Sequence, residues 1–464
     1  MHDAPQLAPQ SPPTAGQLLS LAWPIVLSRS SQVVVGLADG IMVAHLGPAA
    51  LAATTTGALN ALALFILPIG IVFIVSSFSA QFTGAGDAAG ARRYGLYGLG
   101  VAALAGVLCI AGTALVPVAL GQFSYAPDVR ALMTDYLVAR LWSGGAAVGM
   151  EALGNYYGGL GNTRLPMLAN VLAMALNVLG NWLLIDGHLG APALGVRGAA
   201  LASTLSTSIA FLALLGYFLR DGRGEGARSA WAGLRLREFR RMLRYGLPSG
   251  FNWFFEFLAF TFFINVVVAD LGTVALAAMM AVLQVNSTSF MPAFGVASAG
   301  AILVGQHLGA RAHDLVPRTV RLTLTVCGLW QGLVGILYLA APLFFLGFFH
   351  DERTGSFEFL RIGRRMLMMA AAWQLFDATA NTLAEALRAA GDTAFTLWVR
   401  VGIAWIVFVP GVLISMRWLG GGDVVAVCWM VIYIGLLAAV LAWRFRSGAW
   451  RKFDLTAPGE GPSG

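Results

Sequence analysis

Acidic residues inside long apolar stretches are the positions of this sequence best suited to chemistry. Asp39 lies in an apolar run over residues 18–47, Glu256 lies in FNWFFEFLAFTFF, and Asp377 lies in WQLFDATANTLAEAL. A charged carboxylate is costly inside a bilayer, so residues of this kind usually face an ion or substrate pathway. The three acids therefore predict reversible binding of a proton or a cation, with hydrogen bonding to a neighbouring helix as the structural alternative.

Amide and hydroxyl side chains are predicted to surround Asp39. Asn177 and Asn181 lie one helical turn apart, so their amide groups would share one helix face. Ser203 could add a hydroxyl from the following apolar run, and helical spacing places Gln32 on the same face as Asp39. These groups suit a cation site around Asp39, although polar residues in membrane helices also serve simply to bind neighbouring helices.

Aromatic residues accompany the acids of the second half of the chain. Phe260 follows Glu256 by one helical turn, and Trp373 precedes Asp377 by one turn. An acid without a partner in apolar surroundings favours its protonated form, which suits a proton carrier near neutral pH. Aromatic faces attract organic cations, so this half predicts a proton carrier beside a site for lipophilic cations. Contact with lipid or with neighbouring helices is the alternative for the aromatic residues.

Three further charged residues stand apart from these groups. Glu151 and Glu385 lie nearer the ends of their predicted helices, where capping or pairing with loop arginines is expected. Arg29 lies about 16 Å into its predicted helix at a rise of 1.5 Å per residue, too deep for its side chain to reach the interface easily. The sequence alone names no partner for Arg29.

The composition is that of a protein that spans a membrane many times. Hydrophobic residues make up 58% of the 464 residues and charged residues 11%, whereas soluble proteins carry about 25% charged residues. The sequence has no phosphate-binding loop, no zinc-protease motif, no nucleophile elbow and no CxxC pair. Cys109, Cys327 and Cys428 each lie in an apolar run, which indicates neither a disulfide framework nor a metal cluster. We therefore expect no enzyme activity and no cofactor.

About twelve helices long enough to cross a membrane are predicted, which gives an all-α polytopic fold. Clusters of glycine, proline and charged residues separate them. The expected ranges are 18–46, 54–82, 93–120, 131–157, 165–186, 196–219, 244–270, 273–304, 316–349, 357–389, 393–418 and 423–446.

The two sets of six predicted helices resemble one another. Pro24 recurs as Pro248, and the Gly161–Thr163 turn recurs as Gly391–Thr393, at offsets of 224 and 230 residues. Because six is an even number, both halves enter the membrane in the same orientation and form a parallel repeat. Transporters with this symmetry bind their substrate between the halves and change access by rocking them.

The predicted lobes follow from this repeat. They are a disordered cytoplasmic tail at 1–16, an N-lobe of six helices at 17–219, a basic cytoplasmic linker at 220–243, a C-lobe of six helices at 244–446 and a cytoplasmic tail at 447–464. The start of the chain lacks the basic region of a cleavable signal peptide. The linker suits either a surface helix attracted to anionic headgroups or a solvated connection.

The charge distribution predicts the orientation. The net charge of +7 could suggest nucleic acid, but basic loops beside hydrophobic spans have a simpler source in the positive-inside rule. Most of the basic residues fall in cytoplasmic loops and the C-terminal tail when both termini are cytoplasmic. We therefore expect the lipid bilayer, and not nucleic acid, to be the partner of these residues.

With these motifs in view, the chain resembles the multidrug and toxic compound extrusion (MATE) family of bacterial antiporters across nearly its whole length. The resemblance rests on LAWPI and GLADGIMVAHLGPAALAA, on GGLGNTRLPML followed by Asn177 and Asn181, and on LRAAGDT after Asp377. It implies a V-shaped pair of six-helix bundles around a central cavity in the bacterial inner membrane. It also implies export of cationic drugs in exchange for protons or sodium, and it implies no obligate protein partner.

The resemblance implies a cation site in the N-lobe. Asp39, Asn177 and Asn181 match that site by position, and Ser203 stands where threonine is common. If sodium drove the exchange, Asp39, Asn177 and Asn181 would be its ligands.

A second site is implied in the C-lobe. Glu256 and Asp377 match the site of the NorM-like branch. Trp373 departs from that branch, which can carry a tyrosine at this position, because an indole has no oxygen to offer to sodium. We therefore expect a proton as the coupling ion, with sodium as the alternative.

The residues expected to contact a lipophilic cationic substrate are Asp39, Gln32, Glu256, Asp377, Phe260 and Trp373. Two other functions stay open at this stage. A lipid-linked-precursor flippase of the same superfamily would need a basic central cavity, to which only Arg29 and Arg140 are deep enough to contribute. A gated channel would conduct without stoichiometric exchange.

Overall fold

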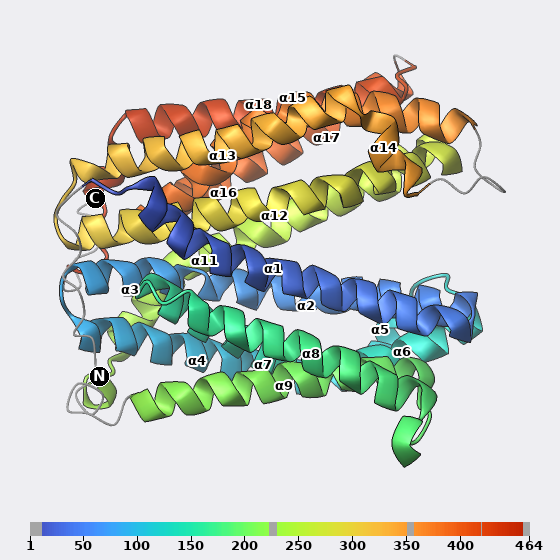
Figure 1. The fold of residues 1–464 in the computed structure, drawn as a ribbon, viewed down its shortest axis with the longest axis horizontal. Helices are drawn as coiled ribbons and strands as arrows, with labels where there is room; N and C mark the ends of the chain where they lie inside the picture. The colour runs from blue at the N-terminus through green and yellow to red at the C-terminus, as the bar shows by residue number, and fades with distance from the viewer. Residues whose placement is uncertain (1–11, 222–229, 350–356, 419, 458–464) are drawn as a thin grey trace. The chain divides into compact units, whose positions relative to one another are not determined.

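The fold is seen in a computed structural model, and every regular element that it describes is helical (Figure 1). The all-α prediction is therefore confirmed. The described residues are 12–221, 230–349, 357–418 and 420–457.

Parts of three predicted segments lie outside the described residues. They are residues 1–11 of the tail expected at 1–16, residues 222–229 of the linker expected at 220–243, and residues 458–464 of the tail expected at 447–464. The predicted lobe boundaries stay predictions.

The first half of the chain folds into helices that match its six predicted spans. They are α1 (Ala15–Val43), η1 (Ala44–Leu46), α2 (Pro48–Val72), α3 (Ile74–Gly84), α4 (Ala88–Gly112), η2 (Thr113–Leu115), α5 (Val116–Leu120), α6 (Pro127–Leu141), α7 (Gly144–Gly159), α8 (Arg164–Asp186), η3 (His188–Gly190) and α9 (Gly195–Asp221).

The second half also folds into helices that match its six predicted spans. Its helices are α11 (Leu236–Phe262), η4 (Phe263–Val268), η5 (Ala269–Leu271), α12 (Thr273–Gly309), α13 (Leu315–Ala340), α14 (Pro342–Gly347), α15 (Phe357–Ala390), α16 (Thr393–Gly402), η6 (Ile403–Phe408), α17 (Val409–Arg417), α18 (Asp423–Arg446) and η7 (Ala449–Lys452). The helix α11 begins eight residues before the span predicted at 244–270.

Ten stretches of helix in the described residues are long and apolar enough to cross a membrane. The two remaining predicted spans have clear reasons for standing outside that set. A turn at Trp142 and Ser143 divides one of them into α6 and α7, of 15 and 16 residues. The other, α15, is 34 residues long but has the polar residues Gln374, Asp377 and Asn381 in its middle, which lower its hydropathy. The protein is thus a multi-pass membrane protein with about twelve spans.

The described residues divide into two structural units. One holds residues 27–250 with 456–457, and the other holds 12–26 with 251–455. The start of α1 therefore belongs with the second half of the chain, and the start of α11 belongs with the first. Each division falls two residues after a proline inside the helix, Pro24 or Pro248, where a helical hydrogen bond is missing.

The repeat extends to backbone conformation. Gly47 and Gly272, which precede α2 and α12, have φ angles of 106° and 99°. Gly161 and Gly391, in the two matching turns, have φ angles of 85° and 102°. Residues with a Cβ rarely adopt these angles, so the same turn conformations explain why glycine recurs at these places.

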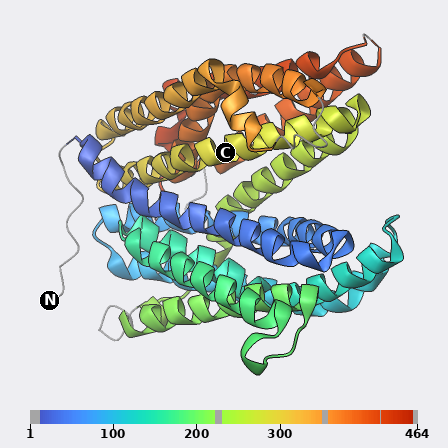
Figure 2. The same cartoon turned by 45° about the vertical axis from the view of Figure 1, so that its right-hand side comes forward.

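Each unit has its own apolar interior. In the first, Phe65 of α2 packs with Met133 and Leu137 of α6. In the second, Phe263 of η4 and Phe408 of η6 belong to one buried cluster with residues of α12, α15 and α18. Within each unit the long helices run side by side along a similar direction (Figures 1 and 2).

Candidate functional site

In the first unit, three helices converge on Asp39. Asn181 on α8 donates from Nδ2 to Asp39 Oδ1 at 2.6 Å, and Asn177 on the same helix donates to that oxygen at 3.2 Å. Ser203 on α9 donates from Oγ to Asp39 Oδ2 at 3.0 Å. Asn177 also donates to Ser203 Oγ at 2.9 Å. The structure therefore brings together all four residues predicted for this site.

Close packing of α8 on α9 positions the donors of this site. A Cβ atom at Gly180 would lie only 3.0 Å from Cβ of Ala202, so the two backbones approach where the glycine lacks a side chain. Asn177 and Asn181 follow each other by four residues and so point from the same face of α8. The four-residue spacing of Asn177 and Asn181, together with the close approach of α8 and α9 at Gly180, directs both amides toward α1.

The Asp39 site is enclosed and largely hydrogen-bonded. Asp39 is 6% exposed, and Asn177 and Asn181 are fully buried. The Oδ1 atom of Asn181 is a buried polar atom without a hydrogen-bond partner in the described residues. A carboxylate held by three neutral donors can bind and release a positive charge while its neighbours stay in place.

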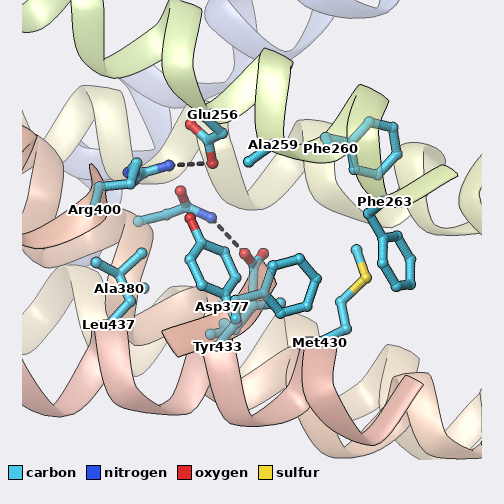
Figure 3. Close-up of a pocket in the computed structure, with 13 residues that line it drawn as sticks. Glu256, Ala259, Phe260, Phe263, Asp377, Ala380, Arg400, Met430, Tyr433 and Leu437 are labelled. Atoms are coloured by element: carbon cyan, nitrogen blue, oxygen red, sulfur yellow. Dashed lines mark hydrogen bonds and ion pairs between the residues drawn. The ribbon is translucent and has the colours of Figure 1, made fainter. Parts of the chain in front are cut away.

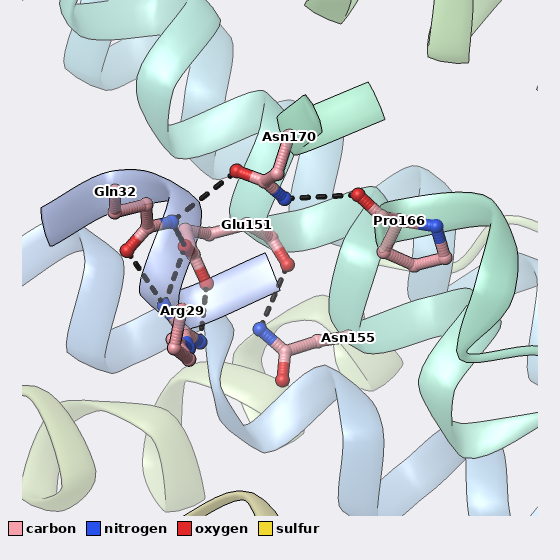
Figure 4. A network of polar contacts seen from close by, with 6 residues as sticks. All are labelled: Arg29, Gln32, Glu151, Asn155, Pro166 and Asn170. Carbon is pink, nitrogen blue, oxygen red and sulfur yellow. Dashed lines mark hydrogen bonds and ion pairs between the residues drawn. The ribbon is translucent and has the colours of Figure 1, made fainter. Parts of the chain in front are cut away.

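Gln32 belongs to a different group of the first unit. Its Nε2 atom lies 3.2 Å from Glu151 Oε1 and 3.3 Å from Asn170 Oδ1, and its Oε1 accepts from Arg29 at 3.3 Å (Figure 4). No hydrogen bond joins Gln32 to Asp39 among the contacts described for this unit. Sharing a helix face with Asp39 thus did not place Gln32 in the same hydrogen-bonded site.

Arg29 has found its partner in this group. Its guanidinium binds both carboxylate oxygens of Glu151 on α7, at 2.9 and 3.0 Å (Figure 4). The expected role of Glu151, capping or pairing with a loop arginine, is wrong, because its partner lies within α1. The two side chains are 20% and 14% exposed, which makes this a largely buried, bidentate ion pair.

The second unit contains a cavity of about 130 Å³ (Figure 3). Glu256, Phe260 and Asp377, three of the residues predicted from sequence, line it. Several water molecules or a small organic group would fit in this volume, whereas drug pockets usually measure about 300 to 1,000 Å³. The full lining consists of Glu256, Ala259, Phe260, Phe263, Asp377, Ala380, Asn381, Arg400, Phe408, Met430, Tyr433, Ile434 and Leu437.

The expectation that Glu256 is an acid without a partner is wrong. Its carboxylate forms an ion pair with the guanidinium of Arg400 on α16 (Figure 3). Asp377, in contrast, accepts hydrogen bonds from two neutral amides, Asn381 at 2.9 Å and Gln331 at 3.3 Å. The two acids of this cavity therefore have different electrostatic partners.

Trp373 lies away from this cavity. It is 2% exposed in the apolar core of the second unit, and its indole nitrogen lies 3.4 Å from Asn286 Oδ1. Phe260, which is 39% exposed, does line the cavity. Each aromatic residue lies one turn from an acid on the same helix face, but only Phe260 lies at the level of the cavity, whereas Trp373 lies one turn away from it along α15.

Sequence reasoning missed Arg400, Gln331 and Tyr433. Arg400 had a usable signal, since Thr393, Thr396, Leu397 and Arg400 are spaced as one face of a helix, and all four are buried. Nothing in the local sequence marks Gln331 or Tyr433, because each approaches the acids from another helix.

Glu385 forms an ion pair with Arg388, one turn later on α15, at 2.5 Å. Both residues are largely buried, at 7% and 8% exposure. The expected pairing of Glu385 with a loop arginine is wrong in the same respect as that of Glu151, because the arginine that it pairs with lies within the helix.

Comparison with known proteins adds a family and a fold. The family model described as MatE matches residues 24–183 and 248–413, which together make up more than half of the chain. A protein of Chromobacterium violaceum named "Probable multidrug resistance protein NorM" is 29% identical over 94% of both chains. A protein of the same name from a Synechococcus species is 30% identical over 84% of this chain and 85% of its own.

Solved structures show the same fold. A transporter of the MOP superfamily from Pyrococcus furiosus superposes with a TM-score of 0.86 at 22% identity, over 97% of this chain and 99% of its own. The structure titled "Crystal structure of MATE in complex with MaL6" superposes with a TM-score of 0.84 at 22% identity, over 97% and 100% of the two chains.

Proposed function

The chain belongs to the MatE family, and from that premise we propose that it is a secondary active antiporter that exports lipophilic organic cations in exchange for protons by alternating access. The names of its relatives, which refer to multidrug resistance, support multidrug efflux as the class of function. The many apolar spans and the absence of a phosphate-binding loop in the sequence support a gradient, and not ATP hydrolysis, as the energy source.

The observation that carries this proposal is the Asp39 site. A buried carboxylate inside a membrane helix is retained where it binds a charge that must come and go. Asp39 accepts hydrogen bonds from Asn177, Asn181 and Ser203, so its ionised form is satisfied between two binding events. Protonation from outside would release a bound cation, and the neutral carboxyl would then avoid a buried charge during the change of access.

A proton is the coupling ion that we propose. In the Asp39 site, Asn177 and Asn181 both direct their N–H groups at the carboxylate. To bind sodium, the alternative coupling ion, both amide groups would have to flip so that their oxygens face the ion. A single carboxylate is sufficient for a proton, whereas sodium needs several oxygen ligands at once.

For the substrate we propose a lipophilic organic cation, with the cavity of Glu256, Asp377 and Phe260 in the second unit as a place of contact. The aromatic and thioether lining of that cavity, including Phe263 and Met430, suits such a ligand. Its volume of about 130 Å³ supports a role in exchanging the coupling ion or holding one end of the substrate, and not enclosing a whole drug molecule.

Neither alternative function gains support from a specific contact. A lipid-linked-precursor flippase would use the positive charges of Arg29 and Arg140. Arg29 is paired with Glu151, while Arg140 contacts Ser143 and lies over the ring of Phe65 at 5.7 Å. A gated channel conducts without stoichiometric exchange, so it would not need a carboxylate such as Asp39 that binds and releases a positive charge. We further propose location in the bacterial inner membrane with both termini in the cytoplasm, as the positive-inside rule favours.

The test of this function uses purified protein in liposomes loaded with ethidium. At a fixed membrane potential, a pH step alone should drive ethidium exchange without sodium. Exchange driven by a sodium step at constant pH would overturn proton coupling in favour of sodium. Absence of exchange with either gradient would overturn the antiporter proposal.

A further inference from the structure

Arg400 gives the cavity of the second unit a positive charge of its own. We infer that Arg400 is a positioning residue that keeps Glu256 engaged in an ion pair and leaves Asp377 as the carboxylate of this cavity that exchanges a positive charge. This inference rests on the proposed antiport function. It moves the exchanged charge from Glu256, which the sequence favoured as an acid without a partner, to Asp377.

Helix α16 holds Arg400 inside the unit. The residue is on the buried helix face that also contains Thr393, Thr396 and Leu397, and its side chain is 8% exposed. A guanidinium at this depth stays charged, so it needs a carboxylate partner. Glu256 is that partner, and its own side chain is 40% exposed. The pair therefore consists of a buried arginine that depends on Glu256 and an acid that reaches it from α11.

Among the ion pairs of the described residues, none includes Asp377. Its carboxylate oxygens accept from the amides of Asn381 and Gln331, which carry no charge. The titratable and charged groups whose fields reach it, or that line the cavity with it, come from four helices. They are Glu256 on α11, Cys327 on α13, Arg400 on α16 and Tyr433 on α18. Of these groups, Arg400 is the positive one.

The charged residues that line the cavity have a net charge that one additional positive charge would neutralise. Among its lining residues, Glu256 and Asp377 are acidic and Arg400 is basic. With both acids ionised, the cavity carries one net negative charge, and one proton or one monovalent cation on Asp377 neutralises it. Without Arg400, two carboxylates would share the cavity and repel each other. The arginine thus sets the number of exchangeable charges at one.

Charge-matched variants test this assignment in the proteoliposome assay. Asp377→Asn should lose proton-driven exchange. Glu256→Gln should lower the initial rate at least about tenfold, because Arg400 without its partner turns to Asp377 and neutralises it. The double variant Glu256→Gln/Arg400→Gln removes one charge of each sign and should return to within about threefold of wild type. Arg400→Lys, which keeps the charge, should stay active.

The pH profile separates positioning from a merely structural role. Arg400→Gln removes a positive charge near Asp377, which then holds its proton more tightly, so the midpoint of the rate profile should move to higher pH by about one unit or more. The midpoint of the double variant should return to the wild-type value. Arg417→Gln breaks an exposed pair with Asp270 in the same unit and should leave the profile unchanged.

Three outcomes would contradict the inference. A double variant that is folded, judged by its melting temperature, but as inactive as Glu256→Gln would show that Glu256 itself carries the exchanged charge. An Arg400→Gln variant with a reduced rate and an unmoved midpoint would reduce the pair to a structural contact. Wild-type protein without exchange under either gradient would instead overturn the proposed function, and the inference would fall with it.

Discussion

Two polar groups of the first unit, around Asp39 and around Glu151, differ in the charge of their hydrogen-bond donors. Around Asp39, every hydrogen-bond donor is neutral, so the charge of the carboxylate is not cancelled by a fixed cation at close range. Around Glu151, the bidentate contact with Arg29 cancels the charge. We therefore assign exchange to the first group and helix attachment to the second.

The first prediction concerns Asp39. Asp39→Asn should abolish ethidium exchange, because an amide keeps the shape of the carboxyl but binds no exchangeable proton. Three hydrogen-bonding neighbours can adapt to the amide, so the free energy of unfolding should change by no more than about 2 kcal/mol. Exchange in proteoliposomes and the melting temperature in detergent are the two measurements.

A matched control for Asp39→Asn is Asp186→Asn. Asp186 lies at the end of α8 and contacts His45 at 2.8 Å in an exposed pair. Its substitution should leave exchange intact. Undiminished exchange in the Asp39 variant would make Asp39 a structural residue.

The second prediction concerns the ion pair of Arg29. Glu151→Gln leaves a largely buried guanidinium without its carboxylate, which should cost about 3 kcal/mol of unfolding free energy. The double variant Arg29→Gln/Glu151→Gln should be more stable than this single variant. The control is Gln32→Leu, which breaks no ion pair. It should lower the unfolding free energy only by about 1 kcal/mol for each hydrogen bond that Gln32 loses. Equal melting temperatures of the single and double variants would argue against a coupled pair.

At the scale of helices, two π-helical segments, η4 and η6, flank the cavity of the second unit. In η4, the side chain of Asn265 donates to the carbonyl of Thr261 at 2.9 Å and so competes with the backbone hydrogen bond of the helix. After η6, Pro410 lacks an N–H group for the carbonyl four residues earlier. Phe263 and Phe408, from these two segments, lie with ring centroids 5.5 Å apart and both line the cavity. Local breaks in helical hydrogen bonding thus shape the cavity wall.

Glycines of α11 set its distance from α2 in the first unit. A Cβ at Gly250 would lie 2.7 Å from both Leu67 O and Ile71 Cγ1, and one at Gly246 would lie 2.8 Å from Ile71 O. Small residues four positions apart allow two membrane helices to approach closely. The spacing of Gly246 and Gly250 therefore has a packing reason.

The third prediction tests this close approach. Gly250→Ala should lower the unfolding free energy by about 1 to 3 kcal/mol, because the added methyl group has no room. Gly216→Ala in α9 meets nothing within 4 Å and should be neutral or stabilise by up to about 1 kcal/mol through helix propensity. Melting curves of both variants in detergent make the comparison. A Gly250 variant as stable as the Gly216 variant would contradict the tight contact.

At the scale of the whole molecule, the fourth prediction concerns orientation. If both termini are cytoplasmic, the turn around Leu189, between the fifth and sixth spans, faces the opposite side of the membrane. Leu189 is 85% exposed, so Leu189→Cys should react with a membrane-impermeant maleimide in intact cells. Ala85→Cys, in the turn between α3 and α4, should react only after the cells are opened.

Two results would bear against this orientation. Labelling of Ala85→Cys in intact cells would reverse it. The parent chain serves as the control, because Cys109, Cys327 and Cys428 all lie within helices. If the parent chain were labelled as strongly as the Leu189 variant, the labelling would come from the native cysteines and would not show that the turn faces the outside.

The sequence by itself determined the spans, the repeat and the Asp39 site. Spans are readable because a bilayer requires about 20 apolar residues in a row, a property of consecutive residues. The repeat is readable because the same turns need glycine at φ angles that other residues avoid, as at Gly47 and Gly272. A shared helix face for Asn177 and Asn181 was predictable because four residues make about one helical turn, and their match to Asp39 was implied by the resemblance to the MATE family.

Only the tertiary structure decided which charges neutralise each other. Arg29 and Glu151 lie 122 positions apart, and Glu256 and Arg400 come from different helices, so no local pattern joins them. The packing of the helices also placed Trp373 in the apolar core and Arg400 at the cavity. Spacing along one helix specifies a face, but the neighbours that this face meets depend on how the helices pack.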